Sequence, residues 1–183
     1  GALTLFIYAQ LKGINIPRDP RIWLKLWCVS LLLNSIPGVL FSLAQTEVTS
    51  ILAGIINATT PIMTLLVMLT IFREERISKN QILGLVVGAT GIATVFGIWN
   101  GFGSNPIWAI CALLISVFCY GISFPFTRRY VIPLQLSSES LAAMQLIAAS
   151  ATLLPFYLID GISSDNYSPT SVLSMLALGI FGS

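Results

Sequence analysis

The sequence has 183 residues, of which 56% are hydrophobic and only 9% are charged, whereas a soluble domain carries about 25% charged residues. Nine Lys and Arg against seven Asp and Glu leave a net charge of +2, which is too small for the basic face that nucleic-acid binding requires. The absence of His excludes His-based acid/base catalysis, imidazole metal sites and Ser-His-Asp triads. We therefore expect neither an enzyme nor a metal or cofactor site, and no nucleic-acid partner.

Long uncharged runs predict five complete transmembrane helices. A helix needs about 20 apolar residues to cross the hydrocarbon core, and the runs between charged residues reach that length. The predicted helices cover, in chain order, residues 23–45, 48–72, 80–99, 106–128 and 139–159. The terminal segments 1–11 and 171–183 are apolar but too short to cross alone, and we expect them to be parts of two further helices.

The fold class that follows is an all-α, multi-pass helix bundle in a lipid bilayer. Backbone amides inside a bilayer must pair within their own segment, and barrel strands would alternate in polarity about every second residue. Lys and Arg accumulate in cytoplasmic loops, and here they occupy only the segments 12–25, 73–79 and 128–129. The intervening loops hold no Lys or Arg, and we predict that they face outward.

Motifs in the first half of the chain give a more specific indication. In order, they are the small-residue run Ala53–Pro61, the tetrapeptide Glu75-Arg76-Ile77-Ser78 followed by Gln81, and the glycines Gly84, Gly88 and Gly91. In this order and spacing, residues 40–97 resemble the EamA-type family of the drug/metabolite transporter superfamily. The segments 108–129 and 141–159 are similar to the sixth and seventh helices of that family.

The resemblance implies a ten-helix architecture, in which two five-helix repeats of opposite orientation enclose a central substrate cavity. On that template the chain runs from late helix 2 to early helix 8. Residues 1–99 then belong to the first repeat and residues 106–183 to the second. The activity that the resemblance implies is the movement of small metabolites across the membrane by alternating access.

Asn57 and Pro61 form the most informative polar pair. Pro61 cannot donate a hydrogen bond to the carbonyl of Asn57, four residues earlier, so a freed carbonyl and an amide side chain coincide near the middle of the span 48–72. Transporters place binding groups on interrupted helices, and we predict that Asn57 and Thr60 contact the substrate. The alternative is that Asn57 bonds a neighbouring helix while Thr60 satisfies the freed carbonyl.

Two more helices carry polar groups beside a proline. Asn34 precedes Pro37, and Tyr120 precedes Pro125, so we predict helix breaks or gating positions at both prolines. We predict that Asn34, Tyr120 and Gln145 line the pathway. Packing contacts, and an interfacial anchor for Tyr120, are the alternatives.

Three charged residues are candidates for other roles. Glu47, in an outer loop, is a candidate for coupling transport to protons, with a solvated loop acid or a charge favouring the helix dipole as the alternative. Glu75 and Arg76 lie at a cytoplasmic turn of mixed charge, and we interpret them as structural or gating groups.

Gly84, Gly88 and Gly91 place small residues on one face of the helix 80–99. Such a face allows a close backbone approach, and we predict packing against another helix of the same chain. A homodimer contact through the same face is the alternative.

No complete span carries a charge near its middle, so the predicted cavity wall offers amides, hydroxyls and aromatic rings but no fixed counter-ion. Together with the resemblance, this predicts a secondary transporter for a small neutral or zwitterionic, amino-acid-like metabolite in the inner cell membrane. A structural or assembly subunit is the alternative. The substitution Asn57→Ala separates them, because a transporter loses flux and a packing residue loses folded protein.

Overall fold

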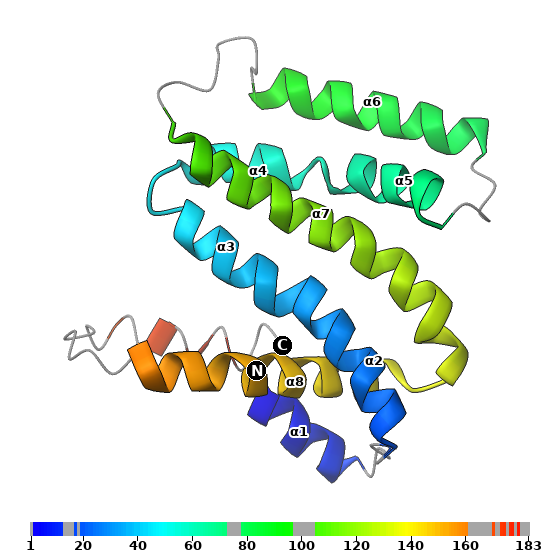
Figure 1. The fold of residues 1–183 in the computed structure, drawn as a ribbon, viewed down its shortest axis with the longest axis vertical. Coiled ribbons are helices and arrows are strands. Elements are labelled where there is room, and N and C mark those ends of the chain that lie inside the picture. Colours follow the sequence, from blue (N-terminus) through cyan, green and yellow to red (C-terminus); the bar gives the residue numbers. More distant parts are fainter. Residues whose placement is uncertain are drawn as a thin grey trace. The chain divides into compact units, whose positions relative to one another are not determined.

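The computed structural model describes residues 2–12, 17, 19–72, 78–96, 105–160, 170, 173–174, 176–177 and 179 of the chain. Most of these residues are helical, and none of them forms a β-strand, which confirms the predicted all-α class. In chain order the elements are α1 (Ala2–Leu11), α2 (Pro20–Ser30), the π-helical turn η1 (Leu31–Ser35), α3 (Ile36–Ala44), α4 (Ser50–Asn57), α5 (Thr60–Thr70), α6 (Lys79–Phe96), α7 (Ile107–Tyr130), the 3₁₀ turn η3 (Ile132–Leu134) and α8 (Ser138–Asp160) (Figure 1).

Four helical stretches within the described residues are long and apolar enough to cross a membrane. They are Pro20–Ala44, Ser50–Thr70, Ile107–Leu134 and Ser138–Ile159, which correspond to four of the five predicted spans. The remaining predicted span forms α6, an 18-residue helix that is not among the four. Its predicted end at residue 99, like most of the segment 171–183, lies outside the described residues.

Polar side chains define where two of the spans begin. Asp19 caps α2 by accepting a hydrogen bond from the backbone N–H of Arg21 at 2.8 Å, and Pro20 occupies the first helical position. Thr49 caps α4, because its Oγ1 accepts from the N–H of Leu52 at 3.3 Å. Both caps satisfy N–H groups that a helix start leaves without a partner inside the helix.

The chain divides into two compact units, which we describe separately. The first unit comprises residues 1–35 and 130–183. Within it, α1, α2 and η1 pack against α8 (Figure 1). Two side-chain hydrogen bonds join α2 to α8: the Oγ of Ser30 donates to the carbonyl of Gln145 at 2.7 Å, and the Nε1 of Trp27 donates to the Oγ1 of Thr152 at 2.9 Å.

The second unit, residues 36–129, has a core built from the end of α3, the inner face of α4 and the first half of α7. Small and branched apolar side chains fill it: Ala44, Val48, Leu52, Ala53, Ile56, Ala109, Ala112, Leu113 and Val117. The small residues let the helices approach closely without the large side chains of a soluble core. This core fixes the faces of α4 and α7 from which Asn57 and Tyr120 extend.

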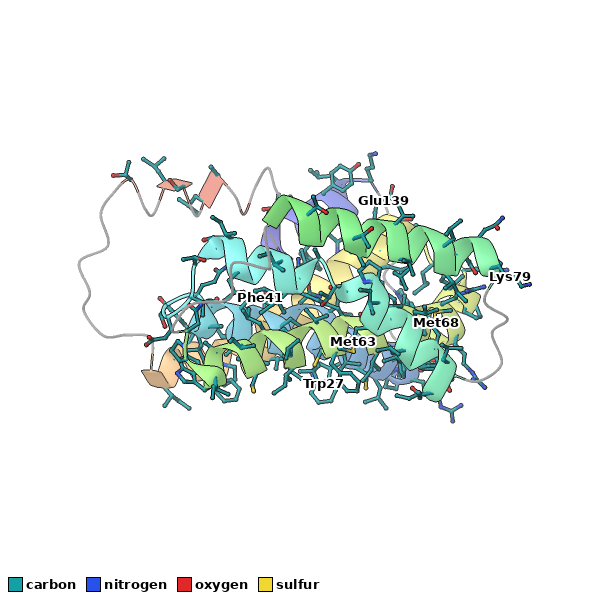
Figure 2. The ribbon with its side chains drawn as sticks, turned by 90° about the horizontal axis from the view of Figure 1, so that it is seen from above. Trp27, Phe41, Met63, Met68, Lys79 and Glu139 are labelled. Atoms are coloured by element: carbon teal, nitrogen blue, oxygen red, sulfur yellow. The ribbon has the colours of Figure 1, made fainter. Side chains whose placement is uncertain are left out.

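A close approach of α5 and α7 lies at Gly121. A Cβ placed at this glycine would stand 3.1 Å from the backbone carbon of Met63 and 3.2 Å from its carbonyl oxygen. Met63, on α5, is labelled in Figure 2. Only a residue without a side chain fits there without moving backbone.

Candidate functional site

Pro61 interrupts its span as the sequence predicts. α4 ends at Asn57, and α5 begins at Thr60. The carbonyl that Pro61 frees does not stay open, because the Oγ1 of Thr60 donates to the carbonyl of Asn57 at 2.6 Å. The preceding carbonyl, that of Ile56, accepts from the N–H of Thr59 at 3.0 Å and from its Oγ1 at 2.6 Å. The carbonyl of Asn57 is therefore already satisfied within the chain, and its amide side chain remains available for another partner.

Asn57 lines a hollow of about 260 Å³ in the second unit, which we call the amide hollow. Its walls come from the end of α3, from α4 and from α7. The lining residues are Phe41, Gln45, Ser50, Ala53, Gly54, Asn57 and Tyr120. The hollow thus brings together two of the residues that the sequence singled out, Asn57 and Tyr120.

The chemistry of the amide hollow is polar but uncharged. Gln45 and Asn57 each supply an amide with two donors and an acceptor oxygen, and Ser50 and Tyr120 supply hydroxyls. The rings of Phe41 and Tyr120 lie with their centroids 6.3 Å apart at 31°, and they give the hollow an aromatic wall. A ligand here finds hydrogen bonds and a ring face but no fixed counter-ion.

The remaining predicted binding residues lie elsewhere. Thr60 is not among the residues that line the amide hollow, and its hydroxyl is engaged at the break. Asn34, in η1, and Gln145, in α8, are half-buried residues of the first unit, where η1 packs against α8. Their contact with a substrate stays a prediction.

Sequence reasoning missed Gln45 and Ser50. Both flank the turn between α3 and α4, and the sequence places them in or beside a short outer loop, where polar residues are expected without any function. The turn between α3 and α4 brings both residues to the wall of the amide hollow. No sequence signal distinguishes them from ordinary loop residues.

Two predicted helix breaks are wrong. α7 runs from Ile107 to Tyr130 without interruption, with Pro125 inside it. At Pro37 the helix also continues. A π-helical turn that ends two residues earlier, at Ser35, accommodates the backbone hydrogen bond that Pro37 cannot make. A proline removes one backbone hydrogen bond, and a π-turn or a local adjustment absorbs that loss where neighbouring helices hold the segment in place.

The charged candidates have different outcomes. Glu47 is an exposed residue of the turn after α3, and its N–H donates to the carbonyl of Ala44 at 3.0 Å; its coupling role stays a prediction. Glu75 and Arg76 lie outside the described residues. Within the described part of the chain, no group of three or more acidic, Cys or His side chains is placed to hold a metal ion.

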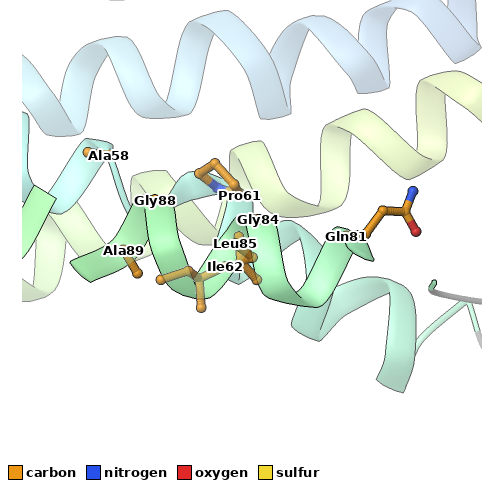
Figure 3. A pocket seen from close by; sticks show the side chains of 8 residues that line it. All are labelled: Ala58, Pro61, Ile62, Gln81, Gly84, Leu85, Gly88 and Ala89. Atoms are coloured by element: carbon orange, nitrogen blue, oxygen red, sulfur yellow. The ribbon is translucent and has the colours of Figure 1, made fainter. Parts of the chain in front are cut away.

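The helix α6 contacts α4 and α5 of the same chain, but its glycines do not mark a close backbone approach. A Cβ added at Gly84, Gly88 or Gly91 would meet no atom within 4 Å. Gly84 and Gly88 instead border a second hollow of about 290 Å³, which faces Ala58 and Pro61 at the break (Figure 3). The spacing of the glycines indicates that a neighbour can approach, but it does not determine how near the neighbour comes.

The apolar spans and the uncharged site define an integral membrane protein built from transmembrane helices. The model of the EamA-like transporter family matches residues 1–97 and 107–183, and the chain belongs to this family, which is part of the drug/metabolite transporter superfamily. It is a membrane transporter of that type, as the sequence motifs predict. Neither a curated protein nor a solved structure matches the chain.

Proposed function

We propose that the chain belongs to a secondary transporter for a small neutral or zwitterionic metabolite of amino-acid-like size, and that the amide hollow is part of its substrate site. The observation that carries this proposal is the set of groups gathered there. Two amides, two hydroxyls and an aromatic wall surround a hollow of about 260 Å³, and none of the lining side chains is charged. This volume lies just below the range of ligand pockets, which begins at about 300 Å³, so only a small solute fits.

The break at Pro61 supports alternating access as the mechanism. Asn57 is the last residue of α4, and α5 starts after a two-residue turn. A hinge of a few residues at the end of an element absorbs the dihedral changes that domain movements require. Movement of α5 relative to α4 would change access to Asn57 while the core beneath α4 stays packed. We place the transporter in the inner cell membrane.

The test is the metabolite profile of cells that express the complete protein, its Asn57→Ala variant or no transporter, at matched membrane abundance. One solute class should change with the unsubstituted protein. Loss of the amide should reduce its flux by about ten-fold, because one hydrogen bond to a desolvated ligand contributes about 1–2 kcal/mol. Tyr120→Phe, which keeps the ring and removes the hydroxyl, should reduce flux less.

Asn80→Ala is the matched control. Asn80 is an exposed amide in the first turn of α6 and does not line the amide hollow, so its variant should transport normally. Equal flux for Asn57→Ala and Asn80→Ala would refute the substrate site. Loss of folded Asn57→Ala protein, with normal flux per remaining molecule, would favour the structural role instead.

A further inference from the structure

An open apolar groove lies between α2 and α8 in the first unit. It holds about 380 Å³ and is lined by Pro20, Trp23, Leu24 and Trp27 from α2 and by Ile147, Ala148 and Ala151 from α8. We call it the Trp groove. Leu24 is 60% exposed and Trp27 is 42% exposed, so the groove is open along its length rather than enclosed like a substrate cavity.

Both indole N–H groups of the Trp groove are occupied within the protein. The Nε1 of Trp23 donates to the carbonyl of Pro17 at 2.9 Å, and the Nε1 of Trp27 donates to the Oγ1 of Thr152 at 2.9 Å. The hydroxyl of Thr152 in turn donates to the carbonyl of Ala148 at 2.8 Å. The groove therefore presents ring faces and aliphatic groups, which suit a hydrocarbon chain and offer nothing to a polar solute.

Two cations alternate with the groove residues along α2. Arg21 follows Pro20 and Lys25 follows Leu24, so each side chain leaves α2 about 100° around the helix from the groove residue before it, and both lie on the same flank of the helix. They belong to the basic segment that the positive-inside pattern places on the cytoplasmic side. The carboxylate of Asp19, the nearest acid along the chain, is engaged as the cap of α2.

We propose that the Trp groove binds one anionic phospholipid, with an acyl chain along the groove and its phosphate held by Arg21 and Lys25. Indole rings favour the membrane interface, and basic sites between transmembrane helices on the cytoplasmic side bind acidic headgroups. Because cations and the apolar Trp groove occur together, the site favours a lipid that has both a net negative charge and an acyl chain. This site is separate from the amide hollow and does not depend on the identity of the substrate.

The test uses the complete protein with every Trp other than Trp23 and Trp27 replaced by Phe, Trp99 and Trp108 included, so that the indole fluorescence reports on the groove. Trp27 is labelled in Figure 2. The protein is reconstituted in bilayers that contain a small fraction of phosphatidylglycerol or phosphatidylcholine with brominated chains, which quench indole fluorescence on contact. We expect the anionic lipid to reach half-maximal quenching at a mole fraction at least about five-fold lower, since each basic residue near a membrane surface strengthens anionic-lipid binding by about that factor.

Three variants make the result specific. Arg21→Gln with Lys25→Gln should abolish the preference for phosphatidylglycerol, whereas Lys79→Gln, which removes a cation at the start of α6, should preserve it. Ala151→Phe should fill the groove and reduce quenching by both lipids. Equal quenching by both lipids in the parent would mean that the groove is solvated by bulk lipid without selection. No quenching would mean that protein covers the groove. Either result overturns the proposal, and neither bears on transport through the amide hollow.

Discussion

At the scale of single residues, Gly121 is a position where one methyl group decides the packing. A Cβ there would stand 3.1 Å from the backbone carbon of Met63 and 3.2 Å from its Cγ. The Cγ can rotate away, but the backbone of α5 cannot move without disturbing its helix. We expect Gly121→Ala to destabilise the folded protein by about 1–3 kcal/mol, which is typical of overpacking at a close contact.

Gly84→Ala is the matched control for this prediction. The same methyl group at Gly84 would meet no atom within 4 Å, and Ala is a better helix former than Gly by about 1 kcal/mol. Thermal unfolding in detergent should therefore rank Gly84→Ala at or above the parent and Gly121→Ala below it. The reverse ranking would show that α6, not α7, makes the close helix contact.

At the scale of elements, η1 leaves a serine without its usual partner. Helical Ser and Thr hydroxyls in this chain commonly donate to a carbonyl of the preceding turn, as Ser116 does to Ala112 at 2.9 Å and Thr64 to Thr60 at 2.8 Å. Ser35 is 3% exposed, and its Oγ has no hydrogen-bond partner among the residues that the structure describes. Backbone bonds in a π-turn span five residues instead of four, which shifts the carbonyl that a serine would otherwise reach.

This difference predicts opposite results for two buried serines five residues apart. Ser30→Ala removes the hydrogen bond to the carbonyl of Gln145 at 2.7 Å and should cost about 0.5–1 kcal/mol, the range of bonds between membrane helices. Ser35→Ala removes only an unsatisfied hydroxyl and should leave stability equal or higher. Unfolding in a denaturing-detergent titration measures both. A larger loss for Ser35→Ala would mean that its hydroxyl finds a partner in the folded membrane protein.

The helices show how far sequence reasoning reaches at this scale. Apolar runs bounded by charges located the spans to within a few residues, because the length of a crossing helix is set by the bilayer. The prolines were less predictable: Pro61 breaks its span, Pro37 sits just after a π-turn, and α7 continues through Pro125. All three remove the same donor, so the outcome depends on which hydroxyls and neighbouring helices lie nearby.

The residues of the amide hollow also differ in how well the sequence predicts them. Asn57 and Tyr120 were identifiable because polar groups inside an apolar span are costly unless they serve a purpose. Gln45 and Ser50 were not, because a polar residue beside a turn costs nothing and carries no signal. The Thr60 hydroxyl caps the carbonyl of Asn57 at 2.6 Å, as one of the two alternatives held. The contact of the Asn57 amide with a substrate stays a prediction.

At the scale of the whole molecule, the distribution of charge predicts how the chain threads the membrane. Every Lys and Arg lies in segments that alternate with loops lacking them, and such alternation sets orientation during insertion. The order of spans in the structure preserves this alternation: the basic pair Arg128 and Arg129 closes α7, and Lys79 opens α6. Both ends are therefore expected on the cytoplasmic side.

Reporter fusions to the complete protein test this orientation. A reporter placed after Lys79 or after Gln135, in the connection between α7 and α8, should be active only in its cytoplasmic form, and one placed after Asn100 only in its external form. Because α6 is the shortest of the proposed crossings, with 18 described residues, the Asn100 fusion is the decisive one. An external Lys79 with a cytoplasmic Asn100 would reverse the topology. A cytoplasmic signal at both positions would mean that α6 does not cross the membrane. The helices α7 and α8 would then have the opposite orientation, and Arg128 and Arg129 would lie outside. That placement would contradict the pattern that the other positive charges follow.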